Sequence, residues 1–67
     1  MQLTQKETLY LKDAASHEKL CITKYTNYAN QLQDTELATM FKDLAQNEQQ
    51  HLNTINDLLK QAGQQTQ

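Results

Sequence analysis

Gln33-Asp34-Thr35 is the stretch that decides the fold, because it interrupts two long helical patterns. Asp and Thr are good N-cap residues, and their side chains compete for backbone groups inside a helix. We therefore predict a turn at about residues 33–35 with a helix on each side. Two helices joined by so short a turn lie antiparallel, so the expected fold class is all-α, a two-helix antiparallel hairpin.

The outer ends of both helices also carry sequence signals. Thr4-Gln5-Lys6-Glu7 matches a capping box, in which the Thr hydroxyl and the Glu carboxylate each accept from the other's backbone N–H. The first helix is therefore expected at about residues 5–32. The second is expected at about residues 35–61, since Gly63 suits a left-handed C-terminal cap. The tail, residues 62–67, ends in four polar residues and is expected to fray.

The size of the chain sets what must stabilise it. A single domain of 67 residues buries too small a fraction of its surface to be comfortably stable alone. A disulfide within the chain is excluded, because Cys21 is the only cysteine. Metal binding or self-association is therefore expected. The absence of Pro and the abundance of Gln, Leu, Ala, Lys and Glu agree with an all-helical chain.

Charge and hydropathy exclude several classes of partner. The formal net charge is −2 and both signs are interspersed, so the sequence lacks the basic stripe of a nucleic-acid or anionic-membrane binder. No apolar run approaches the roughly 20 residues that span a bilayer. The first residues, Met1-Gln2-Leu3-Thr4, lack the segments of a signal peptide. We expect a soluble protein without a secretion signal, with no nucleic-acid or membrane partner.

Each predicted helix carries an apolar stripe with a polar gap. The stripes are Leu11, Ala14, Cys21, Tyr25, Tyr28 and Leu32, then Leu37, Phe41, Leu44, Ile55 and Leu58. Glu18 fills the gap in the first stripe, and Glu48 and His51 fill the gap in the second. Counted from Asp34, Glu18 lies 16 residues before it, whereas the other two lie 14 and 17 residues after it. At a rise of about 1.5 Å per residue, all three fall within about 5 Å of one height.

The three gap residues are suited to metal binding. Glu48-Gln49-Gln50-His51 places a carboxylate and an imidazole three residues apart on one helix face. A two-fold homodimer would form a ferritin-like four-helix bundle and bring together two copies of each gap residue. Four carboxylates in one core cannot all stay ionised without cations. We therefore expect two Fe or Mn ions per dimer, held by Glu18, Glu48 and His51 and shared between chains; zinc accepts the same ligands.

Other interpretations of the same residues stay open. Glu18, Glu48 and His51 could form a buried ion-pair cluster that fixes register, flank a water-filled gap, or lie on a partly exposed face without function. Tyr25, Tyr28 and Cys21 are expected to pack in the core. His17 points to the flank of the stripe and is left out of the site. No Ser or Cys stands beside a base in a recognisable motif, so a nucleophilic enzyme has no support.

The sequence also resembles a known family. The segments from His17 to Ile22, Lys24-Tyr25, Tyr28 to Gln31, Leu44-Ala45 and Glu48 to His51 look like the short spore coat F type proteins of spore-forming Firmicutes. The resemblance covers about residues 4–59 and implies a ferritin-like helical fold, location in the cytoplasm or spore coat, and other coat proteins as partners.

The Glu on the first helix and the Glu-x-x-His on the second also resemble half of a rubrerythrin or ferritin di-iron site. That resemblance implies Glu18, Glu48 and His51 as iron ligands, with ferroxidase or peroxidase-like activity as an expectation. Rubrerythrins have four helices where this chain has two, so a complete site requires a dimer. The alternative hypothesis is a purely structural spore coat or interaction module without metal.

Overall fold

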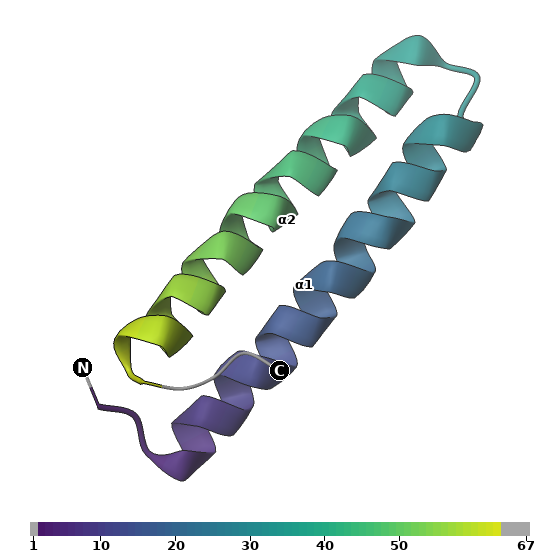
Figure 1. The fold of residues 1–67 in the computed structure, drawn as a ribbon. Helices are drawn as coiled ribbons and strands as arrows, with labels where there is room; N and C mark the ends of the chain where they lie inside the picture. Colours follow the sequence, from purple (N-terminus) through teal and green to yellow (C-terminus); the bar gives the residue numbers. More distant parts are fainter. Residues whose placement is uncertain (1, 64–67) are drawn as a thin grey trace.

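The computed structural model describes residues 2–63, and these form two antiparallel helices side by side (Figure 1). Helix α1 spans Gln5–Gln31 and helix α2 spans Thr35–Gln61, with 27 residues each. Residues 2–63 contain no strand. The predicted all-α hairpin is therefore confirmed, and its helix boundaries are correct to within one residue. The prediction for residues 64–67 lies outside the described residues.

Local capping explains where α1 begins and where α2 ends. The Thr4 side chain accepts a hydrogen bond from the Glu7 backbone N–H at 3.0 Å, and the Thr4 N–H donates to Glu7 Oε1 at 2.9 Å. This is the predicted capping box. At the other end, Gly63 has a φ of +77° and its N–H donates to the Lys60 carbonyl at 3.0 Å. Glycine adopts this left-handed conformation without a Cβ penalty, as the sequence predicted.

The turn between the helices is short because both sides are capped. Leu32 leaves the helical conformation at ψ 132°, while its N–H still donates to the Tyr28 carbonyl at 3.0 Å. Two residues later, Asp34 is the N-cap of α2, and its Oδ1 accepts from the Leu37 N–H at 3.0 Å. These two caps leave little free chain between them, so the helices must fold back on each other.

The side chains buried between the two helices recur at multiples of seven residues. In the described part of the chain they are Thr8, Ala15, Ala29, Leu52 and Leu59, which we call the inner layer. Small residues of α1 thus face large residues of α2. A seven-residue spacing keeps one seam of each helix against its neighbour, as in a coiled coil. The predicted stripes did not contain these residues.

The predicted stripes instead occupy the side of the hairpin next to the inner layer. The seven-residue series of the inner layer continues through Ile22, Ala38 and Ala45. Six half-buried residues each lie three positions after a member of this series; they are Leu11, Glu18, Tyr25, Phe41, Glu48 and Ile55, and we call them the half-open layer. Apart from Leu32, which follows the end of α1, the remaining stripe residues flank the half-open layer together with His51; we call Ala14, Cys21, Tyr28, Leu37, Leu44, His51 and Leu58 the open flank. Three of its apolar members are exposed, by 46% at Tyr28, 43% at Leu37 and 40% at Leu44.

The hairpin is a thin rod with a small interior. Its principal extents are 46 × 14 × 14 Å, so almost every residue lies near the surface. Neither described helix is long and apolar enough to cross a membrane.

Candidate metal centre

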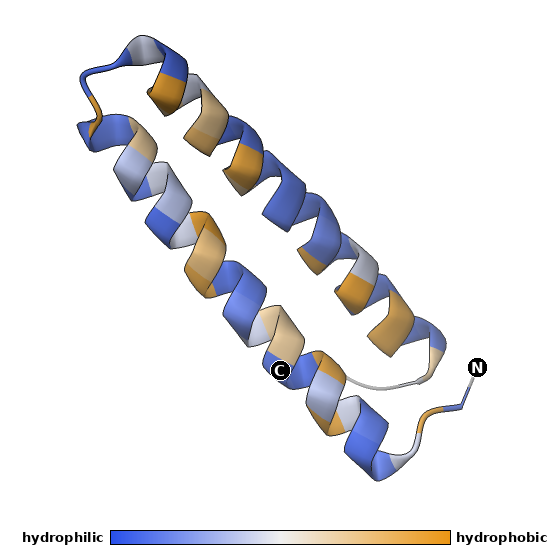
Figure 2. Ribbon diagram, turned by 180° about the vertical axis from the view of Figure 1, so that it is seen from behind, coloured by the Kyte–Doolittle hydropathy of each residue, from blue (hydrophilic) through white to orange (hydrophobic). Residues whose placement is uncertain are grey.

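Glu18, Glu48 and His51 meet midway along the hairpin. Glu18 projects from α1, whereas Glu48 and His51 project from adjacent turns of α2. Figure 2 shows that the apolar segments of α2 are interrupted at mid-length by hydrophilic turns, and these are the turns that carry Glu48 and His51. The sequence prediction that the three residues converge is therefore correct.

The distances between the three side chains suit a shared cation. His51 Nδ1 lies 3.7 Å from Glu18 Oε1 and 3.8 Å from Glu48 Oε1. One ligand atom from each residue lies within 4.8 Å of the other two. Metal–ligand bonds of about 2.0–2.2 Å allow two ligands of one ion to be at most about 4.4 Å apart. The two imidazole–carboxylate pairs already meet this limit, and the two carboxylates lie within 4.8 Å of each other.

Burial differs sharply within the cluster. The Glu18 and Glu48 side chains are 17% and 20% exposed, whereas the His51 side chain is 61% exposed. Both carboxylates belong to the half-open layer and His51 belongs to the open flank. The cluster is therefore closed toward the inner layer and open on the opposite side, where a further ligand can approach.

Glu18 provides the observation that tests whether a cation fits. Its Oε2 atom is buried and has no hydrogen-bond partner in the described part of the chain. An unpartnered carboxylate oxygen removed from water destabilises the folded state unless a donor or a cation compensates it. No lysine accompanies Glu18 and Glu48 in the half-open layer or the open flank. Two carboxylates and an imidazole form a donor set that iron, manganese and zinc accept. The residues therefore fit a divalent metal ion.

An aromatic group lies on the turn side of the cluster. The Tyr28 ring packs edge-on against Phe41 with centroids 5.6 Å apart, and Tyr25 lies 5.9 Å from Phe41. Tilted and edge-on ring pairs at such separations are favourable. Tyr25 is half-buried in these contacts, in line with its predicted packing role. Tyr28 is 46% exposed, so the prediction that it packs in the core is wrong, because it lies outside the seam between the two helices.

His17 and Cys21 lie outside the cluster. The Cys21 Sγ atom is 3.6 Å from His17 Nε2, one turn away on the same helix. His17 is exposed, as its flank position predicted, while Cys21 is half-buried. Sequence reasoning did not anticipate their contact, although the four-residue spacing was the available signal.

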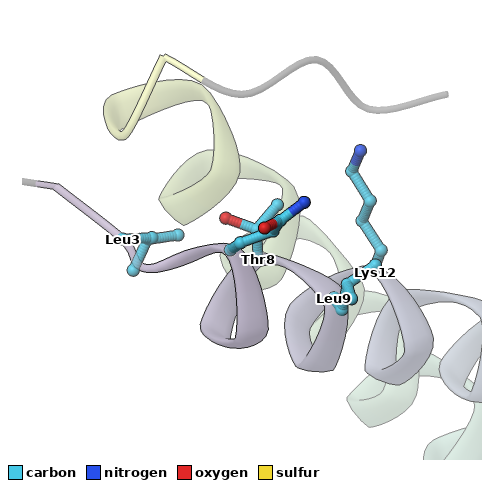
Figure 3. Close-up of a pocket in the computed structure, with 5 residues that line it drawn as sticks. Leu3, Thr8, Leu9 and Lys12 are labelled. Atoms are coloured by element: carbon cyan, nitrogen blue, oxygen red, sulfur yellow. The ribbon is translucent and has the colours of Figure 1, made fainter.

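A hollow near the start of α1 is a separate feature (Figure 3). It is lined by Leu3, Gln5, Thr8, Leu9 and Lys12. The Thr8 hydroxyl there already donates to the Thr4 carbonyl at 3.0 Å. The lining contains no carboxylate, imidazole or thiol side chain, so the hollow offers no metal ligands of the kind gathered at Glu18.

Comparison with known families agrees with the site. The rubrerythrin family model matches residues 10–67, a range that contains all three clustered residues. The chain therefore belongs to the rubrerythrin family and has a ferritin-like hairpin. Comparisons with curated proteins and with solved structures gave no match. Membership supports the half-site resemblance drawn from the sequence, and it implies iron as the metal.

Proposed function

We propose that this protein binds iron in a ferritin-like four-helix bundle made by two copies of the hairpin. Glu18, Glu48 and His51 of each chain would hold the metal, so that two ions are shared by one dimer. Manganese fits the same oxygen and nitrogen ligands. The observation that carries the proposal is the buried, unpartnered Glu18 Oε2 beside Glu48 and His51.

The dimer is part of this proposal because one chain supplies too few ligands. Three donors leave coordination positions open even around a four-coordinate ion, and a second copy would bring three more. A dimer would also gather four carboxylates, whose mutual repulsion two divalent cations would offset. Each element of the rubrerythrin-type ligand set, a Glu on one helix and a Glu-x-x-His on another, would then occur twice.

Bound iron would supply the ability to exchange electrons with O₂ or peroxide, and ferroxidase or peroxidase-like activity is the corresponding hypothesis. The residues of the chain would act by binding and orienting the metal. The half-buried carboxylates would neutralise its charge, and the inner layer would exclude water from one side. Their arrangement supports metal binding. Any catalysis would depend on the bound metal.

Metal stoichiometry tests the proposal. Protein purified without chelator is loaded with Fe(II) under anaerobic conditions, and metal atoms are counted by elemental analysis. We expect about one iron per chain, as two ions shared by a dimer require. Glu48→Gln should lose most of this iron because it removes a ligand charge. The matched control is Asp57→Asn, which neutralises an exposed carboxylate on the same helix and should keep the iron.

The alternative is a structural role without metal, and one contact favours it. His51 Nδ1 lies within 3.8 Å of both carboxylates, so a protonated imidazole could pair with them and fix the register of the helices. Under this hypothesis the folded wild type contains no metal above background after loading. Equal metal content in the wild type and Glu48→Gln would also reject Glu48 as a ligand.

A spore coat location belongs to the proposal through sequence resemblance alone. It would make other coat proteins the partners of the hairpin, in addition to its own second copy. Immunodetection of the chain in fractionated spores tests this point. Recovery only from the mother-cell cytoplasm would reject the location without affecting the metal site.

A further inference from the structure

We infer that the second copy covers one particular side of the hairpin, formed by the half-open layer and the open flank. This inference rests on the proposed function, since it names the surface through which the metal-binding dimer forms. The opposite side of the rod is assigned to solvent.

Contacts between the helices place the open-flank residues of α1 and α2 on the same side. Tyr28, from the open flank of α1, touches Phe41 of the half-open layer across the groove. His51, from the open flank of α2, likewise reaches Glu18 of the half-open layer on α1. Each contact joins a residue of α1 to a residue of α2. The two flanks therefore make one continuous surface along the rod.

The composition of the two sides differs. Among the residues of the half-open layer and the open flank, Glu18 and Glu48 carry a formal charge, and the remaining positions are mostly Leu, Ile, Ala and aromatic residues. The positions that flank the inner layer on its other side are polar at every heptad; they are Lys12, Lys19, Thr26, Lys42, Gln49 and Asn56. Lysines oppose burial against another protein, whereas large apolar residues favour it. The first side is therefore better suited to an interface than the side that carries these lysines.

Burial shows that this side lacks a cover within one chain. Every residue of the half-open layer is half-buried, although these residues lie only three positions from the buried series of the inner layer. Tyr28, Leu37 and Leu44 continue the apolar surface outward while 40–46% exposed. The surface is thus continuous with the contact that already holds the two helices together. A second hairpin laid on it would complete a four-helix core.

A second copy is the occupant that the ligands require. Glu18 and Glu48 share the half-open layer, so in a bundle closed over this side they point toward its central axis. His51, with its side chain 61% exposed on the same surface, opens toward the partner. Any other protein would have to supply its own carboxylates and imidazole at this height. A copy of this chain supplies them by symmetry.

A pair of matched substitutions tests the assignment. Leu44 lies on the open flank, while Leu20 is exposed by 52% on the face of α1 that points away from α2. Leu44→Gln and Leu20→Gln make the same chemical change, and both residue types are good helix formers. A two-fold symmetric dimer contains each substitution twice. Leu44→Gln should therefore raise the dissociation constant of the dimer about 100-fold or more. Leu20→Gln should leave the dimer as in the wild type.

The measurement is sedimentation equilibrium over a concentration series, with and without Fe(II), and circular dichroism to confirm that each variant is helical. Glu48→Gln is included because it separates the interface from the metal. It should lose iron yet remain dimeric, since it removes charge repulsion and leaves the apolar surface intact. A dimer unaffected by Leu44→Gln, or one disrupted equally by Leu20→Gln, would overturn the inference.

The outcomes for the interface and for the metal are distinguishable. A wild type that sediments as a monomer at all concentrations, with and without Fe(II), also overturns the inference. If the dimer responds to Leu44→Gln but no iron is bound, the surface assignment stands and the proposed function fails. If iron is bound and dimer strength depends on Leu20 instead of Leu44, the function stands and the surface assignment fails.

Discussion

Two groups of three side chains lie at neighbouring levels of the hairpin, since Tyr25 follows Glu18 by one heptad on α1 and Phe41 precedes Glu48 by one heptad on α2. The aromatic group is Tyr25, Tyr28 and Phe41, and the ligand group is Glu18, Glu48 and His51. In each group two members belong to the half-open layer and one belongs to the open flank. The same backbone geometry thus accommodates apolar side chains at one level and polar side chains at the next.

The ligand group is therefore not a requirement of the fold. The aromatic group is held together by ring contacts of 5.6 to 6.5 Å between centroids. At the ligand level, in contrast, Glu18 Oε2 is buried without a partner, and both imidazole–carboxylate distances are longer than a good hydrogen bond. Apolar side chains would fill these positions with less cost, so their polarity points to a ligand.

Removing the centre of the aromatic group should have the largest effect on stability. Phe41 contacts both tyrosines, and Phe41→Ala should lower the free energy of unfolding by about 3 kcal/mol, because it deletes a ring and leaves a cavity. Thermal unfolding followed by circular dichroism measures this. Leu9→Ala, at a residue 60% exposed, is the control and should change little. An equally small effect of Phe41→Ala would remove the aromatic group from the stabilising core.

Adding iron should sharpen the contrast by stabilising the ligand group alone. Iron at a hundredfold excess over its dissociation constant should raise the free energy of unfolding by about 2.7 kcal/mol in the wild type, because it binds only the folded state. Glu48→Gln should show almost none of this increase. Anaerobic thermal unfolding with and without Fe(II) makes the comparison, and an equal shift in both proteins would place the bound iron elsewhere.

Replacing the ligand group by apolar side chains should make its level resemble the aromatic level, with packing contacts in place of buried charge. With Glu18, Glu48 and His51 all replaced by Leu, we expect the metal-free protein to become more stable by about 2 kcal/mol, because buried charge is exchanged for packing. Unfolding in the presence of chelator provides the measurement. Loss of helical structure in this variant would mean that the polar cluster itself holds the hairpin together.

Weakening the N-cap of α2 should have the smallest effect on the free energy of unfolding. It should affect the aromatic group and the ligand group alike. Asp34→Ala removes the hydrogen bond to the Leu37 N–H and should cost about 1 kcal/mol. Asp34→Ser keeps an N-cap oxygen and should recover most of the loss. The stability increase on adding iron should match the wild type, since the ligand residues are untouched. A reduced increase would show that the cap positions the metal ligands.

Sequence patterns were sufficient for the ends of the helices and for the height of the site. The capping box at Thr4, the N-cap at Asp34 and the C-terminal Gly63 are local signals, so they act through residues within one turn. The antiparallel arrangement then follows from the short turn. Once it is known, counting residues from Asp34 places Glu18, Glu48 and His51 at one level.

The rotation of each helix about its axis was not predictable in the same way. The apolar arc on α1 is broad enough to include both Ala15 and Cys21, and periodicity gives no reason to bury one before the other. The structure buries Ala15 and Ala29 against Leu52 and Leu59, since small residues let the helices approach while large ones fill the space. The residues of the predicted stripes therefore lie beside the buried seam, on the side that we assign to the second copy.

Two capped helices, their antiparallel pairing and the three residues that meet at mid-length follow from the sequence, because all of these depend on local spacing and on distance from the turn. The folded arrangement was needed to learn which side of each helix faces the other, how deeply Glu18 is buried, and that its Oε2 lacks a partner within the described chain. Those properties depend on how side chains from both helices fill a common space, which spacing along one chain does not specify.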